Sequence, residues 1–256
     1  MDLGQLGLRE KLIEELYAKE LFNINLFGWK IPVADTVVVM WIIMAFLIIT
    51  AFLLTRQMKP VPRGKQNLVE VIVGFFNSFS RDVVGHHWRV FAPYVGTVAL
   101  FLAFANTISL FNFIPGGDYL YKVTGLNFFQ HIPDNFLKPP TRNINIPASL
   151  AVLTMGVCIF EGIAIKKPKN WLRSFFEPSP IVFPFKVFDY FIRPASLTLR
   201  LFGNILGAFI VMELLYLTLP ALLPAPLSIY FDIFDGFLQA YIFVFLSLFY
   251  MAEAVE

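Results

Sequence analysis

Residues 184–219, "PFKVFDYFIRPASLTLRLFGNILGAFIVMELLYLTL", decide the fold class, because this largely apolar segment would be about 50 Å long as one helix. The hydrocarbon core of a bilayer is only about 30 Å thick. The helix must therefore tilt strongly, bend, or lie partly in the interface. Within it lies Arg200, whose guanidinium stays charged under any reachable condition and costs roughly 2.5 to 3.5 kcal/mol at the bilayer centre.

The whole chain has the composition of a membrane protein, since 57% of its residues are hydrophobic and 17% are aromatic. Ordinary soluble domains contain roughly 45 to 50% apolar residues. Apolar runs of spanning length predict an all-α integral membrane fold with about five transmembrane helices and additional amphipathic interfacial helices. We expect a single membrane domain over residues 1–256, with an interfacial N-terminal segment at 1–32 and membrane helices at 33–55, 90–114, 146–165, 187–219 and 228–252.

Three segments outside these spans carry other patterns. Leu8, Leu12 and Leu16 in "LREKLIEELYAKELF" predict either an amphipathic helix at an interface or an ordinary surface helix. Residues 66–84 mix apolar and polar positions at helical spacing, which indicates an interfacial helix. Residues 115–143 are rich in Gly, Pro, Asp and Asn and are predicted to form a long loop.

The orientation follows from the basic residues in the short loops. These residues are Arg56, Lys59, Arg63 and Lys65 after the first span, and Lys166, Lys167, Lys169 and Arg173 after the third. Because cytoplasmic loops carry an excess of Lys and Arg, we expect both loops in the cytoplasm, the N-terminus outside and the C-terminus cytoplasmic. A bacterial plasma membrane is the expected location, with an organelle inner membrane as the alternative, since no transit-peptide pattern is visible.

Arg200 has polar and small neighbours on its own helix. Asn204 lies one turn further and shares its face, while Gly203 and Gly207 would let another helix or a moving surface approach closely. Two other interpretations of Arg200 stay open at this point: a side chain that snorkels to the cytoplasmic interface, or a static pair with an acid. For the two glycines the alternative is plain helix packing.

The last span carries a polar stripe. Asp232, Asp235 and Gln239 are spaced i, i+3, i+7 and therefore share one helix face. Since this helix enters from outside, the two acids are expected nearer the outer surface and Gln239 deeper. For Asp232 taken alone, an exposed residue at the start of a helix is the simpler interpretation.

Two further acids lie within apolar runs. Glu213 is about 220° around an ideal helix from Arg200, so the two charges cannot form a simple ion pair. It is either a carrier of exchangeable protons or a residue near the outer headgroups. Glu161 either lines an inner aqueous path or compensates Lys166 and Lys167 near the interface.

Other chemistry finds no support in the residues present. Cys158 is the single cysteine, so the chain has no disulfide framework and no Cys-based metal site. No His, Cys, Asp or Glu spacing matches a metal site, and neither a phosphate-binding loop nor a Gly-rich dinucleotide motif is present. A net charge of +2 gives no support for nucleic-acid binding. We expect a non-catalytic membrane protein that needs no cofactor.

Five motifs, in order, cover the chain from about Lys59 to its end: "VPRGKQNLVE", "FLAFANTISLFNFIP", "PPTRNINIPASLAV", "RPASLTLRLFGNILG" and "LQAYIFVFLSLFYMAEA". In these motifs the chain resembles subunit a of the F-type ATP synthases. The resemblance implies that Arg200 is the family's essential arginine and that Asn204 and Gln239 are its polar neighbours. It also implies a last pair of spans that forms a long tilted hairpin against a ring of c subunits.

The same resemblance implies an ion-translocating stator with two offset half-channels. This stator couples the flow of ions, expected to be protons, to rotation and ATP synthesis. Glu213, Asp232 and Asp235 are expected along the outer half-channel and Glu161 along the inner one. The implied partners are the c-ring, the peripheral-stalk b subunits, the F1 head indirectly, and membrane lipid. The chain departs from the common pattern at Phe209, where many relatives have an acid, and at Asn143, where many have Asp.

Two other classes of function stay open from the sequence. A self-contained secondary transporter would build its substrate site from this chain alone. A structural membrane anchor would not need the charge of Arg200.

Overall fold

The computed structural model describes residues 20–26, 29–56, 58–111, 137–176, 179–218 and 224–255. Its strands are β1 (Glu20–Leu26) and β2 (Trp29–Ala34). Its α-helices are α2 (Asp35–Thr55), α3 (Lys65–Val84), α4 (Trp88–Thr107), α6 (Asn145–Lys166), α7 (Pro168–Ser174), α8 (Phe183–Thr218), α9 (Pro224–Ile229) and α10 (Gly236–Val255). Short 3-10 turns are η2 (Gly85–His87), η3 (Ile108–Phe111), η5 (Pro140–Arg142) and η6 (Pro180–Val182), and η7 (Tyr230–Asp235) is a π-helix.

Within the described residues, five helical runs are long and apolar enough to cross a membrane. They are Asp35–Thr55, Lys65–Leu110, Asn145–Lys166, Phe183–Met212 and Pro226–Val255. The predicted fold class, an all-α membrane protein with about five spans, is confirmed. The second run joins α3 to α4 through η2. The interfacial position expected for residues 66–84 stays a prediction.

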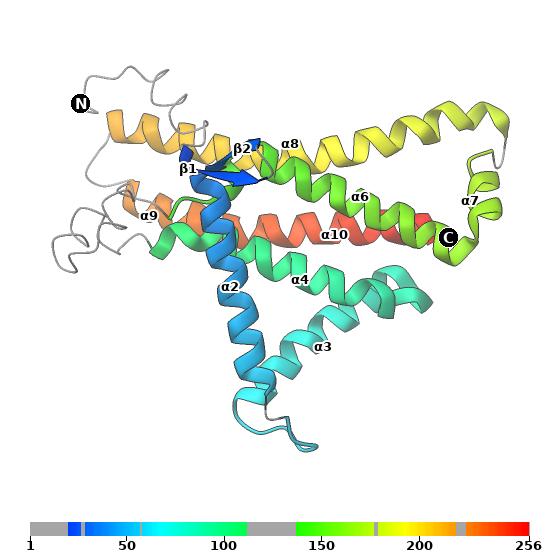
Figure 1. The fold of residues 1–256 in the computed structure, drawn as a ribbon, viewed down its shortest axis with the longest axis horizontal. Coiled ribbons are helices and arrows are strands. Elements are labelled where there is room, and N and C mark those ends of the chain that lie inside the picture. Colours follow the sequence, from blue (N-terminus) through cyan, green and yellow to red (C-terminus); the bar gives the residue numbers. More distant parts are fainter. Residues whose placement is uncertain are drawn as a thin grey trace.

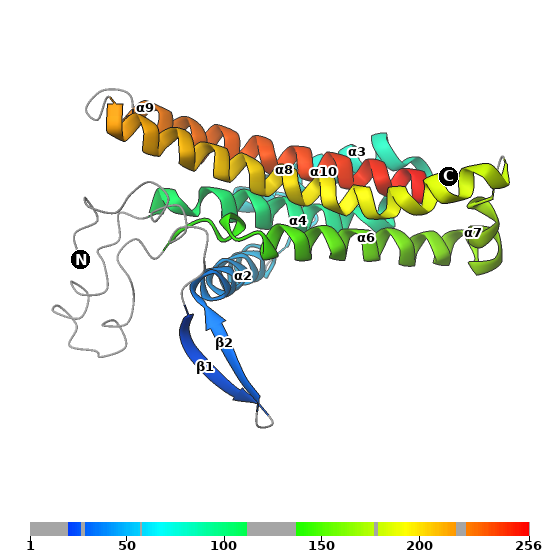
Figure 2. The same cartoon turned by 90° about the horizontal axis from the view of Figure 1, so that it is seen from above.

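Four of the helices, α4, α6, α8 and α10, lie alongside one another, while α2 runs across them (Figure 1). Figure 2 shows α8 and α10 in one layer above α4 and α6. We call the end where α8 finishes and α10 begins the α9 end, and the opposite end the α7 end. The core between the layers is built from fully buried apolar side chains: Leu102, Leu201, Phe243, Leu248 and Met251.

The helix α8 is continuous over 36 residues, which corresponds to about 54 Å. Pro194 lies inside it and does not end it. A straight span across a core of about 30 Å would leave much of this helix outside the hydrocarbon. Because the helix is unbroken, a strong tilt or an end in the interface stays the expected arrangement. Figure 2 shows α8 in one layer with η7 and α10, and contacts between Asn204 and Asp235 and between Arg193 and Glu253 join them.

The N-terminal segment holds an element that was not predicted, a β-hairpin. Strands β1 and β2 pair antiparallel, with Asn23 opposite Pro32 and Asn25 opposite Lys30. The helix expected over "LREKLIEELYAKELF" falls mostly on residues outside the described part, but its last residues, from Glu20 onward, lie in β1. The reason is the alternation of polar and apolar residues in "NINL", a period of two that favours a strand.

Candidate functional site

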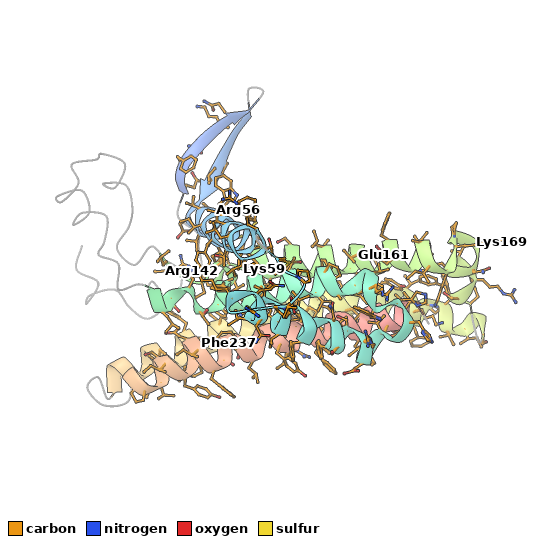
Figure 3. All side chains as sticks on the ribbon, turned by 90° about the horizontal axis from the view of Figure 1, so that it is seen from below. Arg56, Lys59, Arg142, Glu161, Lys169 and Phe237 are labelled. Atoms are coloured by element: carbon orange, nitrogen blue, oxygen red, sulfur yellow. The ribbon has the colours of Figure 1, made fainter. Side chains whose placement is uncertain are left out.

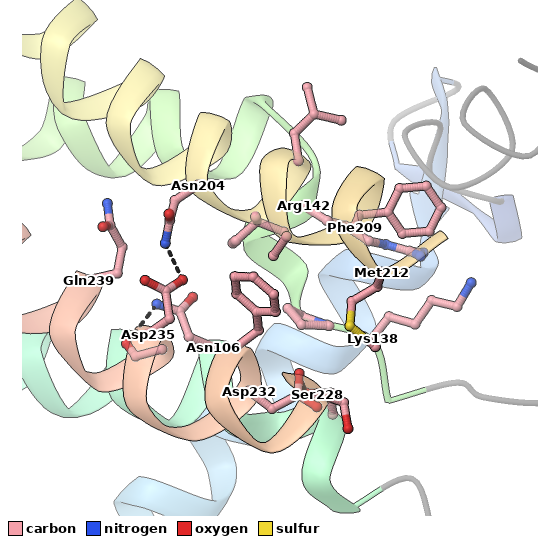
Figure 4. A pocket seen from close by; sticks show the side chains of 17 residues that line it. Asn106, Lys138, Arg142, Asn204, Phe209, Met212, Ser228, Asp232, Asp235 and Gln239 are labelled. Atoms are coloured by element: carbon pink, nitrogen blue, oxygen red, sulfur yellow. Dashed lines mark hydrogen bonds between the residues drawn. The ribbon is translucent and has the colours of Figure 1, made fainter. Parts of the chain in front are cut away.

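A cavity of about 450 Å³ lies at the α9 end, between α4, η5, α8 and the segment formed by η7 and α10 (Figure 4). Its polar lining is Asn106, Ser109, Lys138, Arg142, Asn204, Ser228, Asp232, Asp235 and Gln239. Apolar residues, among them Phe209, Met212 and Phe231, complete the wall. Ionisable groups between membrane-spanning helices are costly, so they indicate a functional site.

A polar contact in the cavity joins the last two membrane segments. The side-chain amide of Asn204 on α8 donates a hydrogen bond to a carboxylate oxygen of Asp235 at the end of η7 (Figure 4). Gln239 lies one turn further along α10 and is only 4% exposed. Its amide nitrogen has no hydrogen-bond partner among the described residues. This buried donor belongs to a residue of the cavity lining and lacks the partner that a buried polar group normally has.

Asp232 lies on the π-helix nearer the chain reversal. Ser109, at the end of the second apolar run, donates a hydrogen bond of 3.0 Å to its carboxylate. The wider turn of η7 still places Asp232, Asp235 and Gln239 around one cavity. Single π-helical turns inside α-helices are frequent at functional sites.

A second chain of hydrogen bonds holds the wall of the cavity together. Thr141 in η5 donates to the amide oxygen of Asn106 at 2.8 Å, and the Asn106 amide donates to the Gly236 carbonyl at 3.3 Å. A side chain at Gly236 would place its Cβ 3.3 Å from Asn106 and from Thr107. Glycine therefore permits the close approach of α10 to α4 that this bond requires.

These wall residues were not among the predicted site residues. The sequence signal for two of them was present, because Asn106 and Ser109 interrupt the apolar run 90–114. No local signal singled out Arg142 or Lys138, which come from the segment before α6. They reach the cavity only because η5 packs against α4 and α8.

Arg200 lies on α8 one turn before Asn204 and is exposed. It forms no hydrogen bond or ion pair with any described residue, so the static acidic partner is not found in this part of the chain. Arg200 is also not part of the cavity lining, which reaches Asn204. Gly203 beside it is exposed, and a Cβ there would meet nothing within 4 Å. The face that carries Arg200 is therefore open.

The two other predicted acids lie apart from this group. The side chain of Glu213 lies outside the described residues, although its backbone belongs to α8. Glu161 lies on α6 toward the α7 end, far from Arg142 and Phe237 (Figure 3). It is half-buried and forms no ion pair with Lys166 or with any other described residue.

A smaller cavity of about 260 Å³ lies near the α7 end, among α6, α7, α8 and α10. On its wall, Arg193 of α8 forms an ion pair of 2.5 Å with Glu253 of α10. The same guanidinium lies 5.0 Å from the centre of the Tyr250 ring. These contacts tie the start of α8 to the end of α10.

The chain is a multi-pass membrane protein, because it has five apolar helical runs of spanning length. Its membrane region holds a charged site, since carboxylates and amides line a cavity between these helices and the exposed Arg200 lies one turn from Asn204 in the lining. The family model of the ATP synthase A chain matches residues 37–252, and the chain belongs to this family. The resemblance inferred from the motifs is confirmed. As a family member, the chain is a membrane subunit associated with ATP synthesis and ion transport.

Curated relatives cover nearly the whole chain. It is 34% identical to ATP synthase subunit a of Moorella thermoacetica over 237 residues, which is 93% of this chain and 96% of that protein. It is 33% identical over 248 residues to ATP synthase subunit a of Propionigenium modestum, which is described as sodium ion specific. This match covers 97% of this chain and 82% of that protein. It is 36% identical over 223 residues to ATP synthase subunit a of Gloeobacter violaceus, a match that covers 87% of this chain and 84% of that protein.

Proposed function

We propose that this chain is the ion-translocating stator subunit a of an ATP synthase, forming two half-channels against a c-ring. It carries out no bond-making chemistry itself and couples ion flow to rotation and to ATP synthesis elsewhere in the complex. One observation carries the proposal: a cavity lined by two carboxylates also includes Asn204, which lies one helical turn from the exposed Arg200.

In this proposal the cavity is the outer half-channel. A cation enters past Asp232 and Asp235, whose carboxylates offset its loss of hydration, and then reaches the amides of Asn204 and Gln239. Glu213 is assigned to the same path. At the end of the path the ion neutralises a rotor carboxylate, because a bare carboxylate would be expensive in hydrocarbon.

Arg200 acts as a fixed charge between the two half-channels. It favours the ionised rotor carboxylate opposite it and repels a cation that would cross directly. Its open face, with Gly203 beside it, leaves room for the moving surface of a c-ring. Ion flow then proceeds only when the ring turns, and at about 2.3 kcal/mol per charge per 100 mV several ions are needed for each ATP.

The inner half-channel is assigned to the α7 end, with Glu161 on its path. We place the N-terminus outside and the C-terminus in the cytoplasm of a bacterial plasma membrane, within one membrane domain. This orientation is supported by the basic residues after α2 and after α6, because positive loops stay on the cytoplasmic side. The proposed ion is the proton, and the proposed partners are the c-ring, the peripheral-stalk b subunits, membrane lipid and, indirectly, the F1 head.

The test is Arg200→Ala in the complete synthase reconstituted into vesicles. ATP-driven ion pumping is expected to be lost while the complex still assembles. Arg63→Ala, which removes an exposed charge from the loop after α2, is the matched control and should pump normally. Full coupling in the Arg200→Ala complex would refute the proposal and favour an anchor. Substrate uptake by the purified chain without c subunits would favour a secondary transporter instead.

A further inference from the structure

A buried ion pair connects α2 to the wall of the large cavity. Asp35, the first residue of α2, accepts a hydrogen bond of 2.8 Å from the Arg142 guanidinium, and the two side chains are 10% and 11% exposed. The other carboxylate oxygen of Asp35 accepts the Thr36 amide at 2.7 Å. Both oxygens of the carboxylate therefore accept hydrogen bonds, which hold the side chain in place.

Arg142 belongs at the same time to the lining of the cavity, together with Asp232 and Asp235 (Figure 4). It cannot easily leave this wall, because its neighbour Thr141 is fully buried and bonded to Asn106 on α4. The 3-10 turn that carries both residues is thus attached to α4 on one side and to α2 on the other.

The position of this guanidinium poses an electrostatic problem for a cation pathway. Without a counter-charge, it would repel a cation in the cavity and would offer the two acids an internal partner. Charges in such a partly water-excluded space interact far more strongly than in bulk water. Asp35 offsets the charge of this guanidinium from the α2 side, while Lys138 is a second basic residue in the lining.

We propose that Asp35 is a positioning residue that holds Arg142 in a neutral pair, so that Asp232 and Asp235 stay available to the incoming cation. This inference rests on the proposed function, since it takes the large cavity as the outer ion path. It assigns to α2, which contributes no residue to the cavity lining, a direct influence on the charge of that path.

The experiment compares Asp35→Asn, the double variant Asp35→Asn with Arg142→Gln, and the control Asp82→Asn in reconstituted synthase stripped of F1. Asp82 is an exposed acid on α3 and gives the same change in net charge away from the cavity. Passive flux is driven by a potassium diffusion potential, with protons followed by a pH-sensitive dye and sodium by radioactive tracer.

We expect Asp35→Asn to slow the flux about tenfold at low ionic strength, because a net repulsive charge at a pathway lowers the arrival rate of cations. High salt should reduce this difference, since it screens the guanidinium. The double variant should recover most of the native flux, and Asp82→Asn should behave like the native complex.

Two results would overturn the inference. One is native flux in Asp35→Asn at low salt, and the other is a double variant as slow as the single one, which would indicate a purely structural contact. Asp232→Asn measured in the same assay separates this failure from that of the proposed function. If Asp232→Asn slows the flux and Asp35→Asn does not, only the role of Asp35 is wrong; if neither does, the cavity is not the path.

Discussion

Asn204 on α8 and Asp235 on η7 are joined by a hydrogen bond although they lie 31 positions apart in the chain. Both residues line the large cavity, and Asn204 lies one turn from Arg200. Here a fixed positive charge, an amide and a carboxylate lie in sequence along the path proposed for the ion. Polar groups between membrane-spanning helices are rare and are usually paired or functional.

The first prediction concerns Asp232, the cavity acid nearer to α9 along the chain. Asp232→Asn keeps a side chain of the same size but removes the charge that attracts a cation. Ion uptake is expected to slow at least about tenfold, with assembly intact. The measurement is ATP-driven pumping together with passive flux, and copurification of the c-ring shows assembly. Unchanged flux would remove Asp232 from the proposed path.

The second prediction concerns Glu161. Because it forms no ion pair among the described residues, neutralising it leaves no partner unpaired and should not affect folding. Glu161→Gln is expected to slow ion release on the cytoplasmic side, which appears as a lower maximal pumping rate. Assembly and ATP hydrolysis by the detached F1 head serve as controls. Normal pumping in this variant would mean that Glu161 has no part in the inner path.

The third prediction tests the contact between α10 and α4. In Gly236→Val the Cβ would lie 3.3 Å from Asn106 and from Thr107, and its two methyl groups need further room, so we expect α10 and α4 to separate and the Asn106 bond to weaken. We expect a loss of about 1 to 3 kcal/mol in stability. Thermal unfolding in detergent measures it. Gly74→Val on α3 is the matched control, because a Cβ there meets nothing within 4 Å; an equal loss in both variants would contradict the close-approach argument.

The fourth prediction separates charge from packing at the α7 end. Glu253 is 53% exposed as a side chain, so Glu253→Gln should change the stability by no more than about 1 kcal/mol. Arg193→Ala also removes the cation from the faces of Tyr190 and Tyr250 and should cost more. The midpoints of thermal unfolding of the two variants give the comparison. A larger loss in Glu253→Gln would show that the ion pair dominates this contact.

Several features could be read from the sequence because they depend on the chain's own periodicity. The length of an apolar run determines whether a helix can span, and so the five spans and the extreme length of α8 were predicted. That Arg200 and Asn204 share one helix face follows from their spacing of four residues alone. The β-hairpin was missed, because a few alternating residues next to a mostly helical pattern give a weak local signal.

The sequence by itself thus determined a membrane protein of about five spans with a charged arginine inside the fourth, since burial in lipid permits only hydrogen-bonded helices of sufficient length here. Only the tertiary structure decided which polar groups share a cavity. The Asn106 bond to Gly236 joins residues 130 positions apart, and the Arg142 bond to Asp35 joins residues 107 apart. Such contacts depend on how whole helices pack, and no local pattern in one chain records them.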